Sequence, residues 1–162
     1  MLARLIFTAV NFAARNGFAE ASAEGSSAKA KARTTGIRGE TFAYWYLRRQ
    51  GYTLVARNYT VPGIKGEIDL IGYDGQALAF VEVKTRSTSV STSAHQHSTP
   101  EDAVTADKRR NLARMARQFL RSRRIDPASC RFDVLAIESY AGKKPIVRLH
   151  KSAFGMAAEL SR

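Results

Sequence analysis

Two apolar segments separated by a turn constrain the fold of this chain most. They are EIDLIGY at residues 67–73 and ALAFVEVKTR at residues 77–86, and both patterns are typical of strands. Asp74-Gly75 lies between them and favours the two-residue turn of a β-hairpin. The sequence therefore predicts an antiparallel hairpin. Both strands nevertheless carry ionisable side chains, which lose favourable hydration when they are buried.

These ionisable side chains are expected on one face of the hairpin. Because side chains alternate across a strand, Glu67 and Asp69 share a face of the first strand, and Glu82 and Lys84 share a face of the second. The predicted turn places Glu67 opposite Glu82, so all four residues gather on one side. A register shift of two residues preserves this arrangement, whereas a shift of one destroys it.

Three carboxylates gathered in this way repel one another unless a positive group joins them. A divalent metal is the simplest such group, and oxygen ligands suit Mg²⁺ or Mn²⁺ better than Zn²⁺. The alternative is an ion pair of Lys84 with one carboxylate in a half-exposed sheet. The combination of Asp69, Glu82 and Lys84 within apolar strands favours the metal site.

A fourth carboxylate is expected on the inward face of a helix. The segment IRGETFAYWYLRRQ at residues 37–50 predicts a helix that ends at Gly51. Glu40 lies one turn before the apolar stripe of this helix, which comprises Ala43, Tyr44 and Leu47. Since a carboxylate is unusual on a face that meets the core, Glu40 is a candidate site residue.

The remaining elements complete one α/β domain. Strands are predicted at residues 52–59, 131–137 and 146–151, a second helix at 101–124, and a short helix within 152–160. The order of helix, three strands, helix and two strands implies a mixed central sheet flanked by helices. The stretch 19–36 is rich in Ala, Ser, Lys and Gly. We therefore expect a flexible N-terminal extension over 1–35 and a folded domain over 36–162.

The second predicted helix carries a periodic row of arginines. Arg110, Arg114, Arg117, Arg121 and Arg124 recur at spacings of four and three residues, and Leu112, Met115, Ala116 and Phe119 lie on the opposite side. The chain holds 26 Lys and Arg against 14 Asp and Glu, a formal net charge of +12. Such a basic ridge is suited to a nucleic-acid backbone, and the alternative is a solubilising surface.

Two further basic residues, Lys108 and Arg86, are candidates for the site. Lys108 falls on the apolar side of this helix near its start, so either its amine reaches the site or its stem lies along the core. Arg86 directly follows the second hairpin strand and is a candidate phosphate contact.

Cys130 is the single cysteine of the chain and cannot form an internal disulfide, which favours a protein of the reducing cytoplasm. We expect Cys130 to be a small residue of the core. No segment is long enough to predict a membrane span.

At these residues the chain resembles the YraN family of small bacterial proteins, which are predicted endonucleases of the PD-(D/E)XK superfamily. The resemblance covers residues 36–154 and rests on GIRGE, LRRQGYTLVARNY, GEIDLI, FVEVKTR, Lys108 with the basic helix after it, RFDVLAI and HKSAF. It implies a restriction-endonuclease-like core. The proline of the PD motif is absent, because Asp69 follows Ile68.

The resemblance also implies a role for each site residue. Asp69 and Glu82 would be metal ligands, together with the backbone carbonyl of Val83. Lys84 would orient or deprotonate the attacking water and offset phosphate charge. Glu40 would complete the site through water, and Lys108 would assist phosphate binding.

The function implied by the resemblance is Mg²⁺- or Mn²⁺-dependent hydrolysis of phosphodiester bonds in DNA. Archaeal Holliday junction resolvases are related to this family, which points to branched or structured DNA, and a substrate with two scissile strands favours a homodimer. The competing hypothesis is a non-catalytic nucleic-acid-binding adaptor in repair, recombination or uptake that retains the fold. An RNA-binding protein would explain the charge but not the carboxylates.

Overall fold

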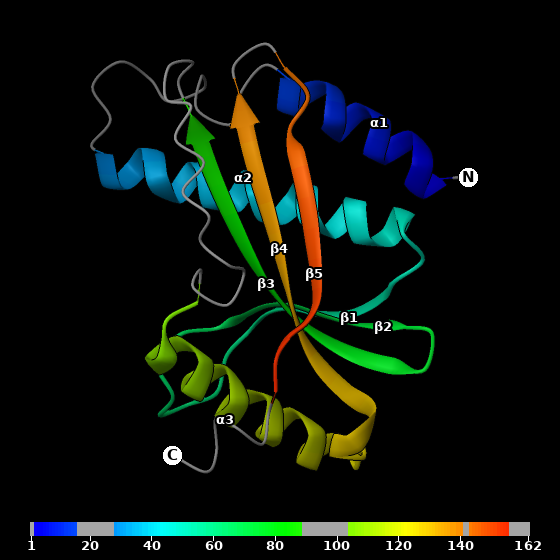
Figure 1. The fold of residues 1–162 in the computed structure, drawn as a ribbon, viewed down its shortest axis with the longest axis vertical. Coiled ribbons are helices and arrows are strands. Elements are labelled where there is room, and N and C mark those ends of the chain that lie inside the picture. The colour runs from blue at the N-terminus through cyan, green and yellow to red at the C-terminus, as the bar shows by residue number, and fades with distance from the viewer. Residues whose placement is uncertain (1, 16–27, 89–103, 141–142, 156–162) are drawn as a thin grey trace. The chain divides into compact units, whose positions relative to one another are not determined.

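The structure is a computed structural model that describes residues 2–15, 28–88, 104–140 and 143–155 (Figure 1). The elements in chain order are α1 (Leu2–Arg15), α2 (Ala28–Arg49), β1 (Thr53–Tyr59), β2 (Ile68–Asp74), β3 (Ala77–Thr88), α3 (Ala106–Arg123), η1 (Pro127–Ser129), β4 (Cys130–Tyr140) and β5 (Ile146–Phe154). None of the helices in these ranges is both long and apolar enough to cross a membrane.

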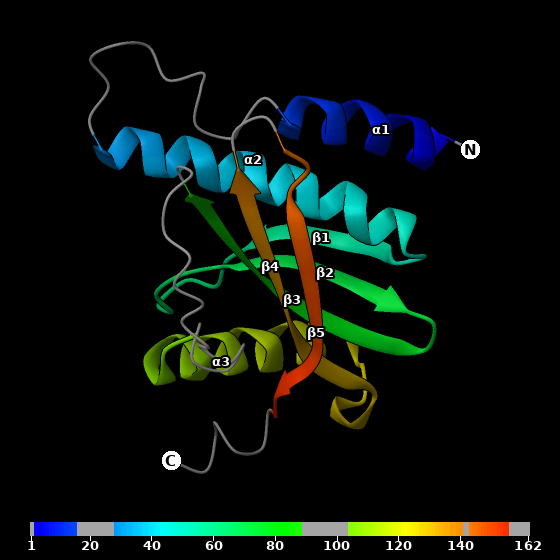
Figure 2. The same ribbon diagram turned by 45° about the horizontal axis from the view of Figure 1, so that its top comes forward.

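The five strands form one mixed sheet in the order β1-β2-β3-β4-β5. The β1/β2 and β2/β3 pairs are antiparallel. Figures 1 and 2 show β3 and β4 running in the same direction and β5 in the opposite one. The predicted fold class, a mixed α/β fold with a central sheet flanked by helices, is therefore confirmed, and it is consistent with a restriction-endonuclease-like core.

The chain divides into two compact units, and β3, β4 and β5 contribute to both of them. The first unit comprises Met1–Gln50, Val83–Gln96 and Leu135–Arg148, and the second comprises Gly51–Glu82, His97–Val134 and Leu149–Arg162. The first therefore contains α1 and α2, and the second contains β1, β2 and α3.

The second unit is organised around the buried face of α3. The Phe119 ring meets the rings of Tyr59 and Phe80 edge to face, at centroid distances of 5.2 and 5.8 Å. The apolar positions predicted for this face, Leu112, Met115, Ala116 and Phe119, are all buried. The helix begins at Ala106 with Thr105 as its N-cap, and residues 101–103 of the predicted helix lie outside the described residues.

The hairpin turn lies one residue later than predicted. Asp74 pairs with Ala77, so Gly75 and Gln76 form the turn, and Gly75 has a φ of 62°. The sequence prediction assumed a turn with glycine in its second central position. Here glycine takes the first one, where a hairpin turn of type II′ requires it. The register consequently moves by two residues, the shift that keeps every side chain on its predicted face.

The first unit contains a helix that was not predicted. Phe7 of α1 packs against Phe42 of α2 at a centroid distance of 5.4 Å, and the Arg49 guanidinium lies 4.9 Å from the centre of the Phe7 ring. Helices thus occupy 2–15 and 28–35, where the sequence predicted a flexible extension. The boundary at residue 36 stays a prediction.

Strand β5 is the last of the described strands and is longer than predicted. Strand β5 continues through Phe154, where the sequence predicted the start of a short helix. The rest of that predicted helix lies outside the described residues.

Helix α2 packs closely against β3 at Gly39, which has no side chain. A Cβ atom at Gly39 would lie 1.9 Å from Oγ1 and 2.9 Å from Cβ of Thr85, far inside van der Waals contact. The GIRGE segment therefore needs its second glycine for helix packing. Because Gly39 precedes Glu40 and Thr85 follows Lys84, this contact also fixes the backbone next to two candidate site residues.

We predict that Gly39→Ala lowers the free energy of unfolding by about 1–3 kcal/mol, because overpacking outweighs the better helix propensity of alanine. Urea unfolding followed by circular dichroism measures the change. Gly36→Ala is the matched control, since nothing lies within 4 Å of a Cβ at that position of α2. Adding Thr85→Ala to Gly39→Ala should restore part of the loss, because it removes the Oγ1 atom at 1.9 Å but keeps the Cβ atom at 2.9 Å. Equal stabilities for the two alanine variants would contradict the close packing.

Candidate metal centre and nucleic-acid interface

Asp69 and Glu82 lie directly beyond the last pair of the β2/β3 ladder, one on each strand. The paired register runs from Asp74–Ala77 to Leu70–Val81, and continuing it by one step would place Asp69 opposite Glu82. Directly opposed residues have Cα atoms about 4.5–5.5 Å apart, and their side chains point the same way. Both side chains are buried, with 8% of Asp69 and 5% of Glu82 exposed. The shared face is as predicted, with Asp69 rather than Glu67 opposite Glu82.

The two carboxylates lie on the side of the hairpin that α3 covers. Asp69 and Ile71 are two residues apart on β2, and so are Glu82 and Phe80 on β3. Side chains two residues apart point to the same face, so each acid shares its face with an apolar residue. Ile71 and Phe80 belong to the same buried cluster as Met115 of α3. The carboxylates therefore continue a core face rather than a solvent face.

Glu67 does not join them as a third ligand. It lies just before β2, and its backbone carbonyl accepts a hydrogen bond of 3.2 Å from Nζ of Lys108. Within the described ranges, no three His, Cys, Asp or Glu residues are grouped so that they could hold a metal ion. Glu67 could have been an outer-shell group or simply the end of the strand, and the structure gives it no place beside the two ligand carboxylates predicted from the sequence, Asp69 and Glu82.

Lys108 reaches the centre from the first turn of α3. Its Nζ lies 3.2 Å from Oε2 of Glu82, and the lysine side chain is 28% exposed. The backbone N–H of Lys108 donates to the side chain of the N-cap residue Thr105, which fixes the start of the helix. Of the two sequence interpretations, the ammonium group thus turns toward the site instead of only snorkelling to solvent.

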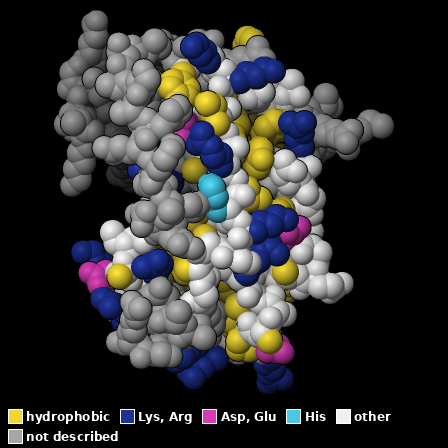
Figure 3. All heavy atoms as spheres, in the orientation of Figure 1, with side chains coloured by type: hydrophobic (Ala, Val, Ile, Leu, Met, Phe, Trp, Pro, Cys, Tyr) yellow, Lys and Arg dark blue, Asp and Glu magenta, His cyan; other side chains and the backbone are white. Residues whose placement is uncertain are grey.

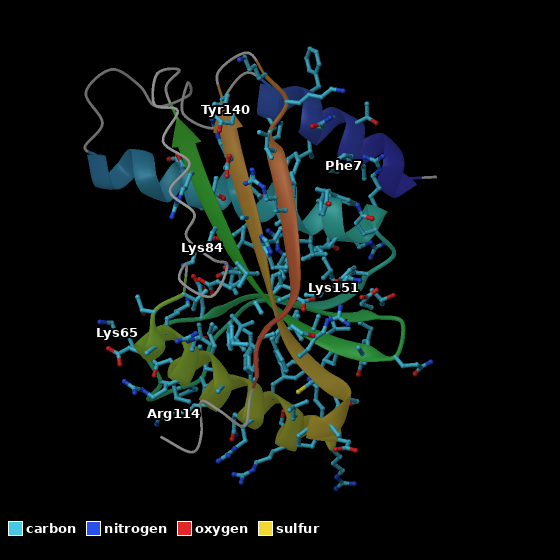
Figure 4. All side chains as sticks on the ribbon, in the orientation of Figure 1. Phe7, Lys65, Lys84, Arg114, Tyr140 and Lys151 are labelled. Carbon is cyan, nitrogen blue, oxygen red and sulfur yellow. The ribbon has the colours of Figure 1, made fainter. Side chains whose placement is uncertain are left out.

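The other predicted site residues have defined places in the first unit. Val83 and Lys84 follow Glu82 along β3 and are half-buried, and Figure 4 labels Lys84 on this strand. By alternation, Lys84 is expected on the same strand face as Glu82. Arg86 is exposed further along the strand. Glu40 is half-buried in α2. The functional roles of these four residues stay predictions.

The donor set suits a hard divalent cation. Asp69 and Glu82 supply two carboxylates, and the backbone carbonyl of Val83 is adjacent in the chain. Mg²⁺ is commonly held by one or two carboxylates, with water and substrate phosphate completing the octahedron. The residues present therefore fit Mg²⁺ or Mn²⁺ without a third acidic side chain.

The arginine row of α3 is solvent-exposed. Every member is exposed in the structure: Arg110, Arg114, Arg117, Arg121 and Arg124. Figure 3 shows basic side chains gathered along the edge formed by α3, and Figure 4 shows Arg114 among them. Arg110 forms an ion pair with Asp107 on the same helix. The predicted division of this helix into a buried apolar face and a basic face is confirmed.

A buried polar network in the second unit was not predicted. Asp133 is fully buried, and it accepts hydrogen bonds from Nε of Arg131 at 2.9 Å, from the Tyr52 hydroxyl at 3.2 Å and from the Ser152 backbone at 2.9 Å. The burial of Tyr52 and the nearby Asp133 charge raise the pKa of the Tyr52 hydroxyl. The only sequence signal was an aspartate inside an apolar strand, which did not reveal its partners.

The same network reaches the end of the carboxylate hairpin. Asp74, the last paired residue of β2, accepts hydrogen bonds of 2.6 Å from Arg131 and from Lys151. These two hydrogen bonds hold the pKa of the Asp74 carboxyl below its usual value. Asp74 therefore ties the hairpin end to β4 and β5, whereas the sequence analysis treated it only as a turn residue.

These features define a mixed α/β protein, consistent with a restriction-endonuclease-like core, that carries an acidic pair beside a basic helix. Comparison with known sequences then gives the family. A family model described as Uncharacterised protein family UPF0102 matches residues 39–137, so the chain belongs to UPF0102, which confirms the YraN resemblance. The matched segment contains every candidate site residue from Glu40 to Arg124.

Relatives in other bacteria support this membership. A UPF0102 protein of Koribacter versatilis is 43% identical over 126 residues, which cover 77% of this chain and 82% of the relative. A UPF0102 protein of Symbiobacterium thermophilum is 43% identical over 122 residues, covering 75% and 97%. One of Solibacter usitatus is 45% identical over 106 residues, covering 65% and 76%.

We predict that Asp74→Asn lowers the free energy of unfolding by about 1 kcal/mol at neutral pH. A carboxyl whose pKa is depressed in the folded state stabilises the fold above its unfolded pKa, and that stability is lost as the pH falls through the folded value. The difference between variant and wild type should therefore shrink below about pH 4. Urea unfolding at both pH values measures it, with the exposed Asp126→Asn as control, because asparagine can keep the capping role of Asp126 at η1. A difference independent of pH would contradict the ionic role.

Proposed function

We propose that this protein is a metal-dependent nuclease that hydrolyses phosphodiester bonds in DNA. The observation that carries the proposal is the burial of two carboxylates, Asp69 and Glu82, directly beyond the Leu70–Val81 pair on adjacent strands, with Lys84 two residues further along β3. Burying acidic side chains is costly unless their charge is compensated. A site for a divalent cation would account for two acids among the buried apolar residues of β2 and β3.

Each residue has a distinct role in this proposal. Asp69, Glu82 and the carbonyl of Val83 would hold Mg²⁺ or Mn²⁺. When bound, the metal supplies Lewis-acid stabilisation of the phosphate and lowers the pKa of the attacking water. As an ammonium, Lys84 would offset phosphate charge and orient that water, and only as a neutral amine could it instead accept a proton from it. Glu40 supports the site through a water molecule.

The basic face of α3 would bind the substrate backbone. From Arg110 to Arg124 the helix rises by about 20 Å, so the exposed guanidinium groups can meet several phosphates of one strand. Such contacts fix position without reading sequence, and their strength falls with salt because they release counterions. Lys108 and Arg86 would add phosphate contacts nearer the carboxylates.

One contact favours a second candidate function. The ion pair of Lys108 with Glu82 shows that a lysine can neutralise one of the two acids. A protein that has lost metal-dependent activity could keep the fold stable in this way. This candidate is a non-catalytic nucleic-acid-binding adaptor in repair, recombination or uptake, which uses the same arginine face.

The proposal also covers the DNA substrate, the oligomeric state and the cellular location. Branched or structured DNA is the candidate substrate because resolvases are related in pattern, and two scissile strands would call for a homodimer. A cytoplasmic location suits the single free cysteine. Burial raises the pKa of the Cys130 thiol, which supports a packing role over a nucleophilic one.

We predict that cleavage of at least one DNA structure requires Mg²⁺ or Mn²⁺ and falls at least about 100-fold in Asp69→Asn and in Lys84→Met, because each removes a charge that the reaction uses. Linear, single-stranded and four-way-junction DNA are incubated with and without metal, and Asp126→Asn serves as a control on an exposed acid. DNA binding without cleavage of any substrate would favour the adaptor. Cleavage that survives Asp69→Asn would contradict the assigned site.

We predict that replacing Arg114 and Arg117 together by glutamine weakens DNA binding about tenfold or more near 0.1 M salt. The slope of log K against log salt should also fall by about two. Fluorescence anisotropy measures both quantities. The matched control replaces the exposed Lys143 and Lys144, which removes the same charge from another surface. Equal losses in the two double variants would show that net charge, not the α3 face, governs binding.

A further inference from the structure

The contacts of Lys108 resemble those of a bound cation. Its Nζ lies 3.2 Å from Oε2 of Glu82 and donates a hydrogen bond of 3.2 Å to the backbone carbonyl of Glu67. The ammonium thus has two oxygen partners, one anionic and one neutral, at the edge of the acidic pair. Oxygen atoms of these two kinds are also the ligands that Mg²⁺ and Mn²⁺ take.

A metal ion and this ammonium would need the same carboxylate. Glu82 is only 5% exposed, so its oxygens have little room to serve several cations at once. Two positive charges a few ångströms apart in a partly buried site repel strongly, because screening by water is weak there. The arrangement therefore favours one occupant over joint occupancy.

The Lys108 side chain can move away from Glu82 without a change in the helix backbone. Its backbone is held by the Thr105 cap at the start of α3, whereas its side chain is 28% exposed and has four flexible methylene groups. The ammonium can move outward while the helix stays in place. The Lys108 ammonium, which has three N–H donors, is then available to bind a phosphate oxygen.

We propose that Lys108 is an exchangeable counterion of Glu82, displaced when a divalent cation binds and then free to contact substrate phosphate. The proposal rests on the metal site proposed above and adds its regulation. In the metal-free protein Lys108 compensates the buried carboxylate, which keeps the fold stable and the metal affinity low. Since linkage is reciprocal, DNA phosphate that attracts Lys108 would tighten metal binding.

The test is titration of the full-length protein with Mn²⁺ in the absence of DNA, by calorimetry and by thermal unfolding. Lys108→Met should bind Mn²⁺ about tenfold more tightly than wild type. Without metal this variant should melt at a lower temperature, and Mn²⁺ should raise its melting temperature more than that of wild type. Lys108→Gln keeps a hydrogen-bond donor without the charge and should behave in the same way.

Two control variants separate this effect from general changes in charge. Lys108→Arg retains the cation and should keep the wild-type Mn²⁺ affinity. Lys65→Met removes a charge from the exposed turn before β2 and should leave the affinity within about twofold of wild type. In DNA titrations, Lys108→Met should lose the mutual enhancement between Mn²⁺ and DNA binding.

Unchanged or weaker Mn²⁺ binding in both Lys108→Met and Lys108→Gln would overturn the proposal, as would a wild type and variants that all fail to bind Mn²⁺. Tighter binding in the variants supports it whether or not the protein cleaves DNA, because the titration contains no substrate. A protein that shows this exchange but cuts no DNA would leave the counterion role intact and contradict only the nuclease function.

Discussion

The pairing register of one hairpin is the constraint on which the candidate site depends. With Gly75 and Gln76 in the turn, Asp69 comes opposite Glu82, and both side chains enter the face covered by α3. A slip of one residue would send the two acids to opposite faces of the sheet. Asp74 closes the ladder next to the turn, and its ion pairs with Arg131 and Lys151 resist such a slip. The polar network around Asp133 thus supports the site from the far end of the hairpin.

Helix α3 connects this register to the proposed chemistry. Its apolar face packs on the hairpin through Phe119 and Phe80, which sets where the first helical turn lies. Lys108 in that turn reaches Glu82, while Arg114 and its neighbours point to solvent. One helix therefore carries a core face, a counterion for the acidic pair and a basic face suited to a phosphate backbone. In this account, cation binding and nucleic-acid binding are coupled because both act on Lys108.

The sequence predicted those features that depend on periodicity. Alternation put Asp69 and Glu82 on one face, and the helical repeat separated the α3 arginines from Phe119 correctly. Features that depend on tertiary partners were missed, because no local pattern shows that Asp133 meets Tyr52 or that α1 packs on α2 through Phe7. The turn was misplaced by one residue because glycine is accepted at different positions in different turn types. The same shift in register moves Glu67 away from the position opposite Glu82, where the predicted turn had placed it.

The central claim is that Asp69 and Glu82 together bind a divalent cation. Anomalous diffraction from crystals grown with Mn²⁺ tests it most directly, because it locates the metal independently of any activity. We predict a single strong peak within ligand distance of both carboxylates, with the Lys108 ammonium withdrawn from Glu82. Crystals at saturating Mn²⁺ with no peak at these residues, and with Lys108 still paired to Glu82, would contradict the account.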